Sequence, residues 1–357
     1  MNQKIRVLVV DDSALVRKTI TETLSMDHDI EVVGSAVDPI IAMEKIPRLQ
    51  PDVMTLDMEM PRMDGLSFLR QLKEQGSTIK VVVISSLTQQ GSQIALEAME
   101  AGAIDVLAKP DGQMSIGALA SQLAFHVKAA ACARRQPFRL QSEFSGDLLK
   151  SSLKTLNTLT PLDAMDRRLI VIGASTGGVE ALRYLLPQLP DGLPPILIVQ
   201  HIPAFFSKAV AERINKLTPY PVREAIDDEP LHKGLCLISP GNQHLMVVLK
   251  NGHYRTRLTQ SPAVHHCRPA VDVLFRSAAE AGGDHVLAAL LTGMGSDGAM
   301  GMQTIARAGG ITLAEHQSSC VVFGMPRAAI ERGAVKQVVP LNQMADALIQ
   351  SVQALAH

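Results

Sequence analysis

Short apolar runs alternate with amphipathic stretches from Ile5 to about Val127, and this alternation predicts repeated strand–helix units around a parallel sheet. The short runs are rich in β-branched residues and predict five strands, at Ile5–Val10, Ile30–Ala36, Val53–Leu56, Lys80–Ser85 and Ile104–Leu107. The amphipathic stretches predict helices at Ala14–Met26, Ile40–Pro47, Gly65–Lys73 and Gly91–Ala101, and a fifth from about Met114 onward. Five such units predict one doubly wound α/β domain.

The same rhythm returns after Arg168 and predicts a second α/β domain with a mostly parallel sheet. Its strands are expected at Leu169–Ile172, Pro195–Gln200, Leu235–Ile238, Val286–Leu291 and Gly310–Ala314. The stretch 241–258 instead predicts a β-hairpin, in which Asn251 and Gly252 form the turn between Leu245–Leu249 and Tyr254–Leu258.

Between the two regions the pattern decays into an Ala-rich run and then a polar mixture of Ser, Thr and Leu, without a strand signal. We interpret residues 129–166 as a linker, part of it compatible with a helix, between domains at 1–128 and 167–357. A chain of 357 residues also exceeds the roughly 250 to 300 residues at which a single core stops growing.

Charge and cysteine content narrow the range of partners and compartments. Lys and Arg number 34 against 35 Asp and Glu, so the net charge of -1 gives no global attraction for nucleic acid or an anionic membrane. The four cysteines lack CxxC spacing, which fits reduced thiols in a cytoplasm. The first apolar stretch is shorter than that of a signal peptide, and no run of 18 apolar residues offers a membrane span. We therefore expect a cytoplasmic monomer with no nucleic-acid partner and no membrane insertion.

Polar residues stand at the carboxyl ends of the first domain's expected strands, where open parallel sheets bind ligands. Asp11 and Asp12 follow the first strand, Asp57 the third, Ser85 ends the fourth and Lys109 follows the fifth. One such aspartate alone is explained more simply as a turn residue, but the coincidence at successive strand ends favours a site. Crowded carboxylates need a compensating cation, and ligand sets made only of oxygen favour Mg²⁺. Such a site lets Asp57 attack phosphorus, while Ser85 and Lys109 contact the transferred group.

Three segments resemble the signatures of response-regulator receivers, which have a (βα)5 flavodoxin-like fold: Val7–Ser13, Leu56–Gly65 and Ala108–Pro110. The resemblance implies that a histidine kinase phosphorylates Asp57, and that Ser85 and Lys109 are the switch hydroxyl and the phosphate-sensing lysine. It also implies a Mg²⁺ site formed by Asp11, Asp12, Asp57 and the backbone carbonyl of Glu59. Arg62 matches no general role of the family.

The second domain begins with a strand, a tight Gly-rich turn that contains Ser175, and a helix. A serine in such a turn is exposed to substrate, and backbone N–H groups at the helix start can stabilise an oxyanion. A serine needs a base and the base needs an orienting carboxylate, and His201 and Asp297 after later strands can supply both. The turn also matches the G-x-S-x-G elbow of ordinary α/β hydrolases, but that fold places its acid before its histidine.

Each of these three residues can also be explained without catalysis, because glycine turns, strand-end histidines and Asp-Gly turns are common in purely structural roles. A response regulator whose second domain only binds a partner is the strongest rival. A DNA-binding domain would show a basic helix or a helix-turn-helix, and we find neither. The hypothesis of a dinucleotide-dependent enzyme has still less support, because Gly173–Gly178 lacks the G-x-G-x-x-G spacing.

The segment from Leu169 to about Pro340 resembles the catalytic domain of chemotaxis methylesterases, a hydrolase-like α/β fold. The matching stretches are Gly173–Gly178, Gln200–Pro203, Arg268–Phe275 and Leu291–Gly298. The resemblance implies that Ser175 is the nucleophile, His201 the general base and acid, and Asp297 the orienting acid. It further implies the backbone N–H of Met294 as an oxyanion donor and Thr176 as another active-site residue.

This resemblance implies an enzyme that cleaves methyl esters on chemoreceptor glutamates, deamidates particular receptor glutamines and needs no cofactor for either reaction. Its receiver would control access to the catalytic face. The chain departs from the family at Ala270, where a serine is common, so a hydroxyl contact is expected to be missing. A Zn²⁺ site at His265, His266 and Cys267 is disfavoured because adjacent residues seldom converge on one ion, and we expect a surface or substrate-facing role.

Overall fold

The computed structural model describes residues 3–86, 88–109, 116–134 and 167–355, so most of the predicted linker lies outside the described residues. The chain divides into two compact units, residues 1–133 and 134–357, which are described separately. Among the described helices, none is long and apolar enough to cross a membrane.

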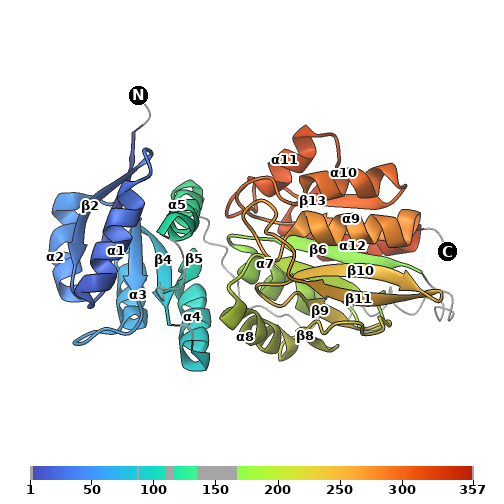
Figure 1. Ribbon diagram of the computed structural model, residues 1–357, viewed down its shortest axis with the longest axis horizontal. Coiled ribbons are helices and arrows are strands. Elements are labelled where there is room, and N and C mark those ends of the chain that lie inside the picture. Colours follow the sequence, from blue (N-terminus) through green and yellow to red (C-terminus); the bar gives the residue numbers. More distant parts are fainter. Residues whose placement is uncertain (1–2, 87, 110–115, 135–166, 356–357) are drawn as a thin grey trace. The chain divides into compact units, whose positions relative to one another are not determined.

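The first unit is a five-stranded parallel sheet in the order β2-β1-β3-β4-β5 (Figure 1), which confirms the predicted fold. Its strands are β1 (Ile5–Val10), β2 (Ile30–Ala36), β3 (Val53–Asp57), β4 (Lys80–Ser85) and β5 (Asp105–Ala108). Its helices are α1 (Ala14–Ser25), α2 (Pro39–Leu49), α3 (Gly65–Glu74), α4 (Gln89–Ala101) and α5 (Ile116–Cys132). The strand order reverses between β1 and β3, so the acidic strand ends meet at a topological switch point.

Local sequence explains where these helices begin and end. Ser13, Asp38, Asp64 and Thr88 are N-caps whose side-chain oxygens each accept a backbone N–H from the first turn of the helix that follows. Thr88 starts α4 two residues before the predicted position. Glycine is required at Gly65, because a Cβ atom there would lie 2.3 Å from the carbonyl oxygen of Asp57.

The second unit is a seven-stranded parallel sheet in the order β14-β13-β12-β6-β7-β9-β8. Its strands are β6 (Leu169–Ala174), β7 (Ile196–Gln200), β8 (Val222–Glu224), β9 (Cys236–Ile238), β12 (Val286–Leu290), β13 (Ile311–Glu315) and β14 (Gln337–Val339). Its helices are α7 (Gly178–Leu185), α8 (Ala204–Asn215), α9 (Val271–Gly282), α10 (Ala299–Arg307), α11 (Met325–Glu331) and α12 (Leu341–Ala354). All five predicted strands are present, and β8 and β14 are additional three-residue strands at the two edges.

The predicted hairpin is also present, as β10 (His244–Lys250) paired antiparallel with β11 (His253–Thr259). Its turn residues Asn251 and Gly252 both have positive φ, as the two-residue turn requires. The hairpin lies beside α9 (Figure 1), and α9 in turn packs on β6 and β12. Because β6 lies between β12 and β7 at the centre of the sheet, the loops after these three strands converge at one edge.

Candidate functional site

Ser175, His201 and Asp297 form one hydrogen-bonded chain at the carboxyl edge of the second sheet. Ser175 Oγ lies 3.1 Å from Nδ1 of His201, and Nε2 of His201 lies 2.8 Å from Oδ2 of Asp297. Ser175 follows β6, His201 follows β7 and Asp297 lies in the loop after β12, so adjacent strands bring them together. This is the mutual geometry expected of a nucleophile, a base and an orienting acid.

The imidazole of His201 presents Nδ1 to the serine and Nε2 to the carboxylate. A neutral imidazole carries one N–H and one acceptor nitrogen, and the carboxylate requires the N–H at Nε2. The tautomer assigned from these partners therefore leaves Nδ1 as the acceptor for the Ser175 proton.

Asp297 is the most completely hydrogen-bonded carboxylate of the site. Its Oδ1 accepts the backbone N–H groups of Asp272 and Gly298 at 2.8 and 2.9 Å, and its Oδ2 accepts that of Val271 at 2.7 Å. Burial raises the pKa of Asp297, but the hydrogen bond from His201 and the backbone donors outweigh burial and hold that pKa below its usual value. Asp297 therefore remains an anion that can stabilise a protonated His201.

The same contacts explain how the chain tolerates alanine at position 270. Ala270 is the N-cap of α9 and offers no side-chain acceptor. Two N–H groups of the first turn, those of Val271 and Asp272, instead donate to Asp297. The orienting acid thus accepts two N–H groups at the start of α9, where the N-cap residue has no side-chain acceptor.

Backbone clamps fix the turn that carries Ser175. Its N–H donates to the carbonyl of Thr292 at 3.0 Å, and the Thr292 hydroxyl donates to the carbonyl of Thr176 at 3.0 Å. Gln200 Nε2 donates to the carbonyl of Ser175 at 2.9 Å, and its Oε1 packs so closely against Gly178 that a Cβ atom there would lie 2.1 Å away. Thr292 and Gln200 had no predicted role, although both lie within the matching stretches of the sequence.

The predicted oxyanion donor belongs to a loop that passes directly over the serine. A Cβ atom at Gly293 would lie 2.7 Å from the Cβ of Ser175, so the backbone that leads into Met294 is in contact with the nucleophile. Thr176 is buried beside Ser175 and is tied to the same loop through Thr292.

Cys267, for which a surface or substrate-facing role was expected, lies at this site and contacts His201, a contact that was not predicted. Its Sγ lies 3.5 Å from Nδ1 of His201, on the side of the ring that faces Ser175. Burial lowers the pKa of His201, whereas Cys267 and Asp297 raise it more strongly, so the net pKa lies above the ordinary value of histidine.

Three neighbouring side chains at this site have ligand atoms close enough to hold a metal ion, but they are already hydrogen-bonded within the protein. Atoms of His265, Asp272 and Asp297 lie within 4.8 Å of one another. His265 Nε2 is 2.9 Å from Oδ2 of Asp272, and Oδ1 of Asp272 accepts the N–H of Gly301 at 2.6 Å. With the carboxylates bound in this way, the group forms a hydrogen-bond network and gives no support for an ion.

The first unit contains an acidic pocket of the kind typical of Mg²⁺ sites, formed by Asp11, Asp12 and Asp57, whose oxygens lie within 4.8 Å of one another. Asp57 Oδ2 accepts from Lys109 Nζ at 2.7 Å, and Asp57 Oδ1 accepts from the N–H of Glu59 at 3.2 Å. Asp11 Oδ2 is buried and has no hydrogen-bond partner among the described residues. Burial and the neighbouring charge of Asp57 raise the pKa of Asp11 to about 6, and burial also raises the pKa of Asp57. A divalent cation fits this pocket, because it would neutralise the crowded carboxylates and contact the unpartnered oxygen.

The predicted switch residues border the pocket. Ser85 is at the end of β4, the strand next to Asp57, and its hydroxyl donates to the carbonyl of Gly91 at 3.1 Å. Arg62, for which no role was predicted, forms an ion pair with Asp38, the N-cap of α2. This ion pair ties the loop after Asp57 to the neighbouring helix.

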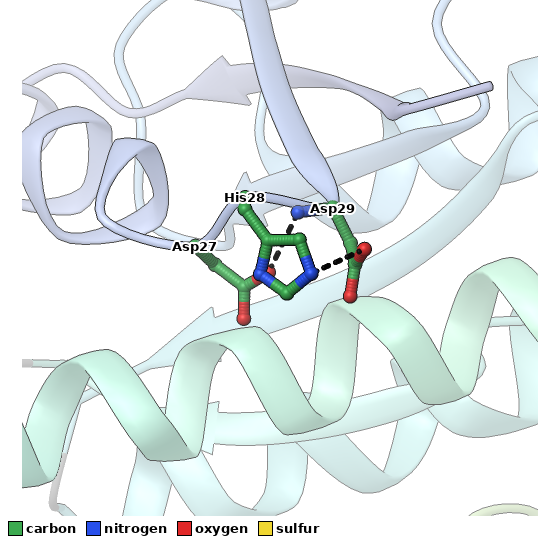
Figure 2. A group of neighbouring side chains, drawn as sticks. All are labelled: Asp27, His28 and Asp29. Carbon is green, nitrogen blue, oxygen red and sulfur yellow. Dashed lines mark hydrogen bonds and ion pairs between the residues drawn. The ribbon is translucent and has the colours of Figure 1, made fainter. Parts of the chain in front are cut away.

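A second acidic cluster in the first unit has a different character. Asp27, His28 and Asp29 lie together in the turn before β2, as Figure 2 shows. Lys128 Nζ lies 2.9 Å from Oδ2 of Asp27 and 2.7 Å from Oδ2 of Asp29. An ammonium group of the protein thus offsets part of the negative charge of this cluster, and its contacts tie α5 to the turn before β2.

The two units together define a response regulator whose output unit is a serine-hydrolase-type α/β fold. Residues 7–119 match the profile of the response regulator receiver domain, and residues 170–348 match that of the CheB methylesterase. The chain belongs to the CheB methylesterase family.

Curated relatives match over almost their whole length. The protein-glutamate methylesterase/protein-glutamine glutaminase 2 of Syntrophus aciditrophicus is 45% identical over 350 residues, which are 98% of this chain and 99% of the relative. The corresponding enzyme 1 of Xanthomonas euvesicatoria is 46% identical over 347 residues, 97% of this chain and 96% of the relative. Among solved structures, the Thermotoga maritima CheB methylesterase catalytic domain is 39% identical, with a TM-score of 0.51, over 51% of this chain and 97% of that domain.

Proposed function

We propose that this chain is a receiver-controlled protein-glutamate methylesterase that hydrolyses methyl esters on chemoreceptor glutamates for chemotactic adaptation. The observation that carries the proposal is the hydrogen-bonded chain from Ser175 through His201 to Asp297, in the unit that matches the methylesterase family. The names of the full-length relatives supply the substrate class.

The proposed reaction is acyl transfer through Ser175. Its Oγ attacks the ester carbonyl carbon while Nδ1 of His201 takes the hydroxyl proton, and Asp297 stabilises the imidazolium that forms. The backbone N–H of Met294 is the proposed donor to the oxyanion, with Thr176 beside it. Methanol leaves with the proton from His201, and water, deprotonated by the same nitrogen, then releases the glutamate carboxylate.

The same chemistry supports a second activity on receptor glutamines. The side-chain amide of glutamine offers Ser175 the same kind of acyl carbon as the methyl ester, with ammonia as the leaving group. The relatives carry both activities in their names. Neither reaction needs a cofactor in this proposal, because the nucleophile, the base and the acid are all side chains.

The receiver is proposed to control this unit through Asp57, which accepts a phosphoryl group from a histidine kinase. Asp11, Asp12, Asp57 and the backbone carbonyl of Glu59 would hold Mg²⁺, which neutralises charge on the transferring group. Lys109 would pair with the phosphoryl oxygens, and Ser85 would exchange its bond to the Gly91 carbonyl for one to phosphate. The phosphorylated receiver would then favour the arrangement in which the catalytic face is open.

The proposed organisation is a receiver at 1–128, a linker at 129–166 and a catalytic domain at 167–357. We infer a cytoplasmic monomer that meets two protein partners, the chemoreceptor and the kinase, and acts without nucleic acid or membrane insertion. The cytoplasm is where a histidine kinase would phosphorylate the receiver.

The test is methanol release from methyl-labelled chemoreceptor, with and without a small phosphodonor and Mg²⁺. We expect release to fall at least about 10³-fold in Ser175→Ala, because removing the nucleophile disables the catalytic residues that act with it. Asp57→Asn is the matched control, and it should keep the unstimulated rate but lose the response to phosphodonor. No release by folded wild-type protein, on a substrate that another esterase cleaves, would sink the proposal.

A further inference from the structure

One wall of the candidate active site is a tight turn at Val264–Cys267 that is held in an unfavourable backbone conformation. Val264 and Cys267 exchange two backbone hydrogen bonds, of 3.0 and 2.9 Å. Between them His265 and His266 have φ values of 52° and 62°, a region that residues with a Cβ atom seldom adopt. His265 is further tied to the buried Asp272 at 2.9 Å, so the turn is fixed despite its strain.

The residue after the turn is anchored as firmly as the turn itself. The Arg268 guanidinium donates to Oδ1 of Asn242 at 3.0 and 2.7 Å and to the carbonyls of Gln260 and Ser261 at 2.9 and 3.2 Å. The N–H of Asn242 returns a hydrogen bond to the carbonyl of Arg268 at 3.1 Å. Cys267 therefore lies between two anchored residues, and its backbone has little freedom to move.

These anchors place the thiol against the candidate catalytic base. Cys267 Sγ lies 3.5 Å from Nδ1 of His201, and Ser175 Oγ lies 3.1 Å from the same nitrogen. The opposite edge of the ring is held by Asp297 at 2.8 Å. Asp297 and Ser175 hold the ring at its two nitrogens, which still lets the imidazole tilt about the line between them. The thiol is a further contact at Nδ1 and restricts this tilt.

We propose that Cys267 is a positioning residue for His201: its thiol holds the Nδ1 edge of the imidazole in the orientation that faces Ser175. This inference rests on the proposed esterase function. Cys267 acts through His201 and makes no bond to the ester.

The first test compares Cys267→Ala and Cys267→Ser with the wild-type full chain in the methanol-release assay. Loss of one orienting contact should lower kcat of Cys267→Ala about three- to tenfold and leave KM within about twofold. The acid limb of its kcat/KM profile should also shift, because the thiol contacts the nitrogen that takes the proton. Cys267→Ser, which keeps a short polar side chain, should recover at least about half of the lost kcat.

A purely structural role gives a different result. It would lower the melting temperature of Cys267→Ala and leave both kcat per folded molecule and the acid limb unchanged. That outcome, or wild-type kinetics in Cys267→Ala, would overturn the inference while the esterase function stands. An inactive wild-type protein would instead count against the proposed function.

A chemical probe keeps the inference testable even if these variants fold poorly. Methyl methanethiosulfonate reacts with a thiolate to form a mixed disulfide and release methanesulfinate, and it adds only a thiomethyl group. Cys236 and Cys320 are buried, whereas Cys267 is partly accessible and Cys132, in the other unit, is exposed. Cys132→Ser is therefore the matched control.

We expect the reagent to inactivate the wild-type protein and Cys132→Ser equally, and dithiothreitol to restore both. Cys267→Ser should keep its activity in the presence of the reagent. If this variant folds poorly, the wild-type protein gives the same information: as dithiothreitol removes the thiomethyl group from Cys267, measured by mass, activity should return in parallel. Full activity of wild-type protein carrying the thiomethyl group on Cys267 would overturn the inference.

Discussion

The two sites of this chain solve opposite electrostatic problems with the same residue type. Both place a buried aspartate at the carboxyl edge of a parallel sheet. Burial raises the pKa of Asp297, but His201 and three backbone N–H groups outweigh it, and the net pKa lies below its usual value. Asp11 has an unpartnered oxygen and a charged neighbour in Asp57, and its pKa is raised to about 6.

The difference lies in the donors that the protein itself supplies. The site at Asp297 is complete, so its charge is available for catalysis without any added group. The site at Asp11 and Asp57 has fewer donors than it has carboxylate oxygens, and Asp11 Oδ2 has no hydrogen-bond partner among the described residues. This deficit makes the site receptive to a cation and to a phosphoryl group. The activity of the site at Asp297 should therefore depend on the charge of that carboxylate. The stability of the site at Asp11 and Asp57 should instead respond to pH and to an added cation.

Asp297→Asn should have the largest effect. The amide offers one acceptor oxygen where the carboxylate offers two. Its NH₂ group must face either His201 and the N–H of Val271, at the position of Oδ2, or the N–H groups of Asp272 and Gly298, at the position of Oδ1. We expect kcat for methanol release to fall about 10³- to 10⁴-fold, as for the acid of comparable triads. Asp284→Asn, on an exposed carboxylate, is the control and should be unchanged. A kcat within about tenfold of wild type would mean that Asp297 does not orient the base.

The acidic pocket of the receiver should show a pH dependence that Mg²⁺ removes. The folded-state pKa of Asp11, about 6, lies above the unfolded value of 3.8, so its contribution to stability is present below about pH 4 and is lost as pH rises through 6. Without metal, the receiver should therefore lose about 1 to 3 kcal/mol of unfolding free energy between pH 4 and pH 7.5. Mg²⁺ should raise its stability more at pH 7.5 than at pH 5.

Calorimetry of the full chain at these pH values, with Mg²⁺ or with a chelator, measures both effects. Asp11→Asn is the control, and it should reduce the metal-free pH dependence because one of the two carboxyls with a raised pKa is gone. Equal stabilisation by Mg²⁺ at both pH values would contradict the view that the pocket is short of positive charge.

The secondary-structure elements that could be predicted from the sequence are those with a local pattern of apolar residues. Apolar runs located the ten strands predicted for the two parallel sheets to within a few residues, whereas β8 and β14, with three residues each, are too short for a periodic pattern. Neither the orientation of the His201 ring nor the contact of its Nδ1 with Cys267 could be predicted. Both depend on contacts across 66 and 96 residues of chain, which no local pattern encodes.

Site residues divide in the same way. Ser175, His201 and Asp297 stand in motifs at strand ends, so their convergence follows from strand order once the sheet is known. Thr292 and Gln200 act through contacts with the backbone around Ser175, and a side chain that serves a distant carbonyl leaves no distinctive spacing. A purely structural role for each of these residues can be set aside only once its tertiary contacts are known.

Glu315 gives the test with the smallest expected effect, because it is a buried carboxyl with one unpartnered oxygen, like Asp11, but lies in the same unit as Asp297. It is fully buried, its Oε2 accepts the N–H of Thr292 at 2.8 Å, and its Oε1 has no hydrogen-bond partner among the described residues. Burial raises its pKa to about 7 from 4.5, so its contribution to stability is present below pH 4.5 and is lost as pH rises through 7. Glu315→Gln keeps an acceptor for Thr292 but cannot ionise.

We therefore expect Glu315→Gln to be more stable than wild type by about 1 to 3 kcal/mol at pH 8.5 and to match it within about 1 kcal/mol at pH 5, as measured by urea unfolding. Glu280→Gln, on an exposed face of α9, should show no such pH-dependent gain. A gain in Glu315→Gln that is the same at both pH values would show that the amide packs better, and not that the wild-type carboxyl lacks donors. A gain confined to high pH would extend the comparison to a third carboxyl, one that has a single backbone donor where Asp297 has three.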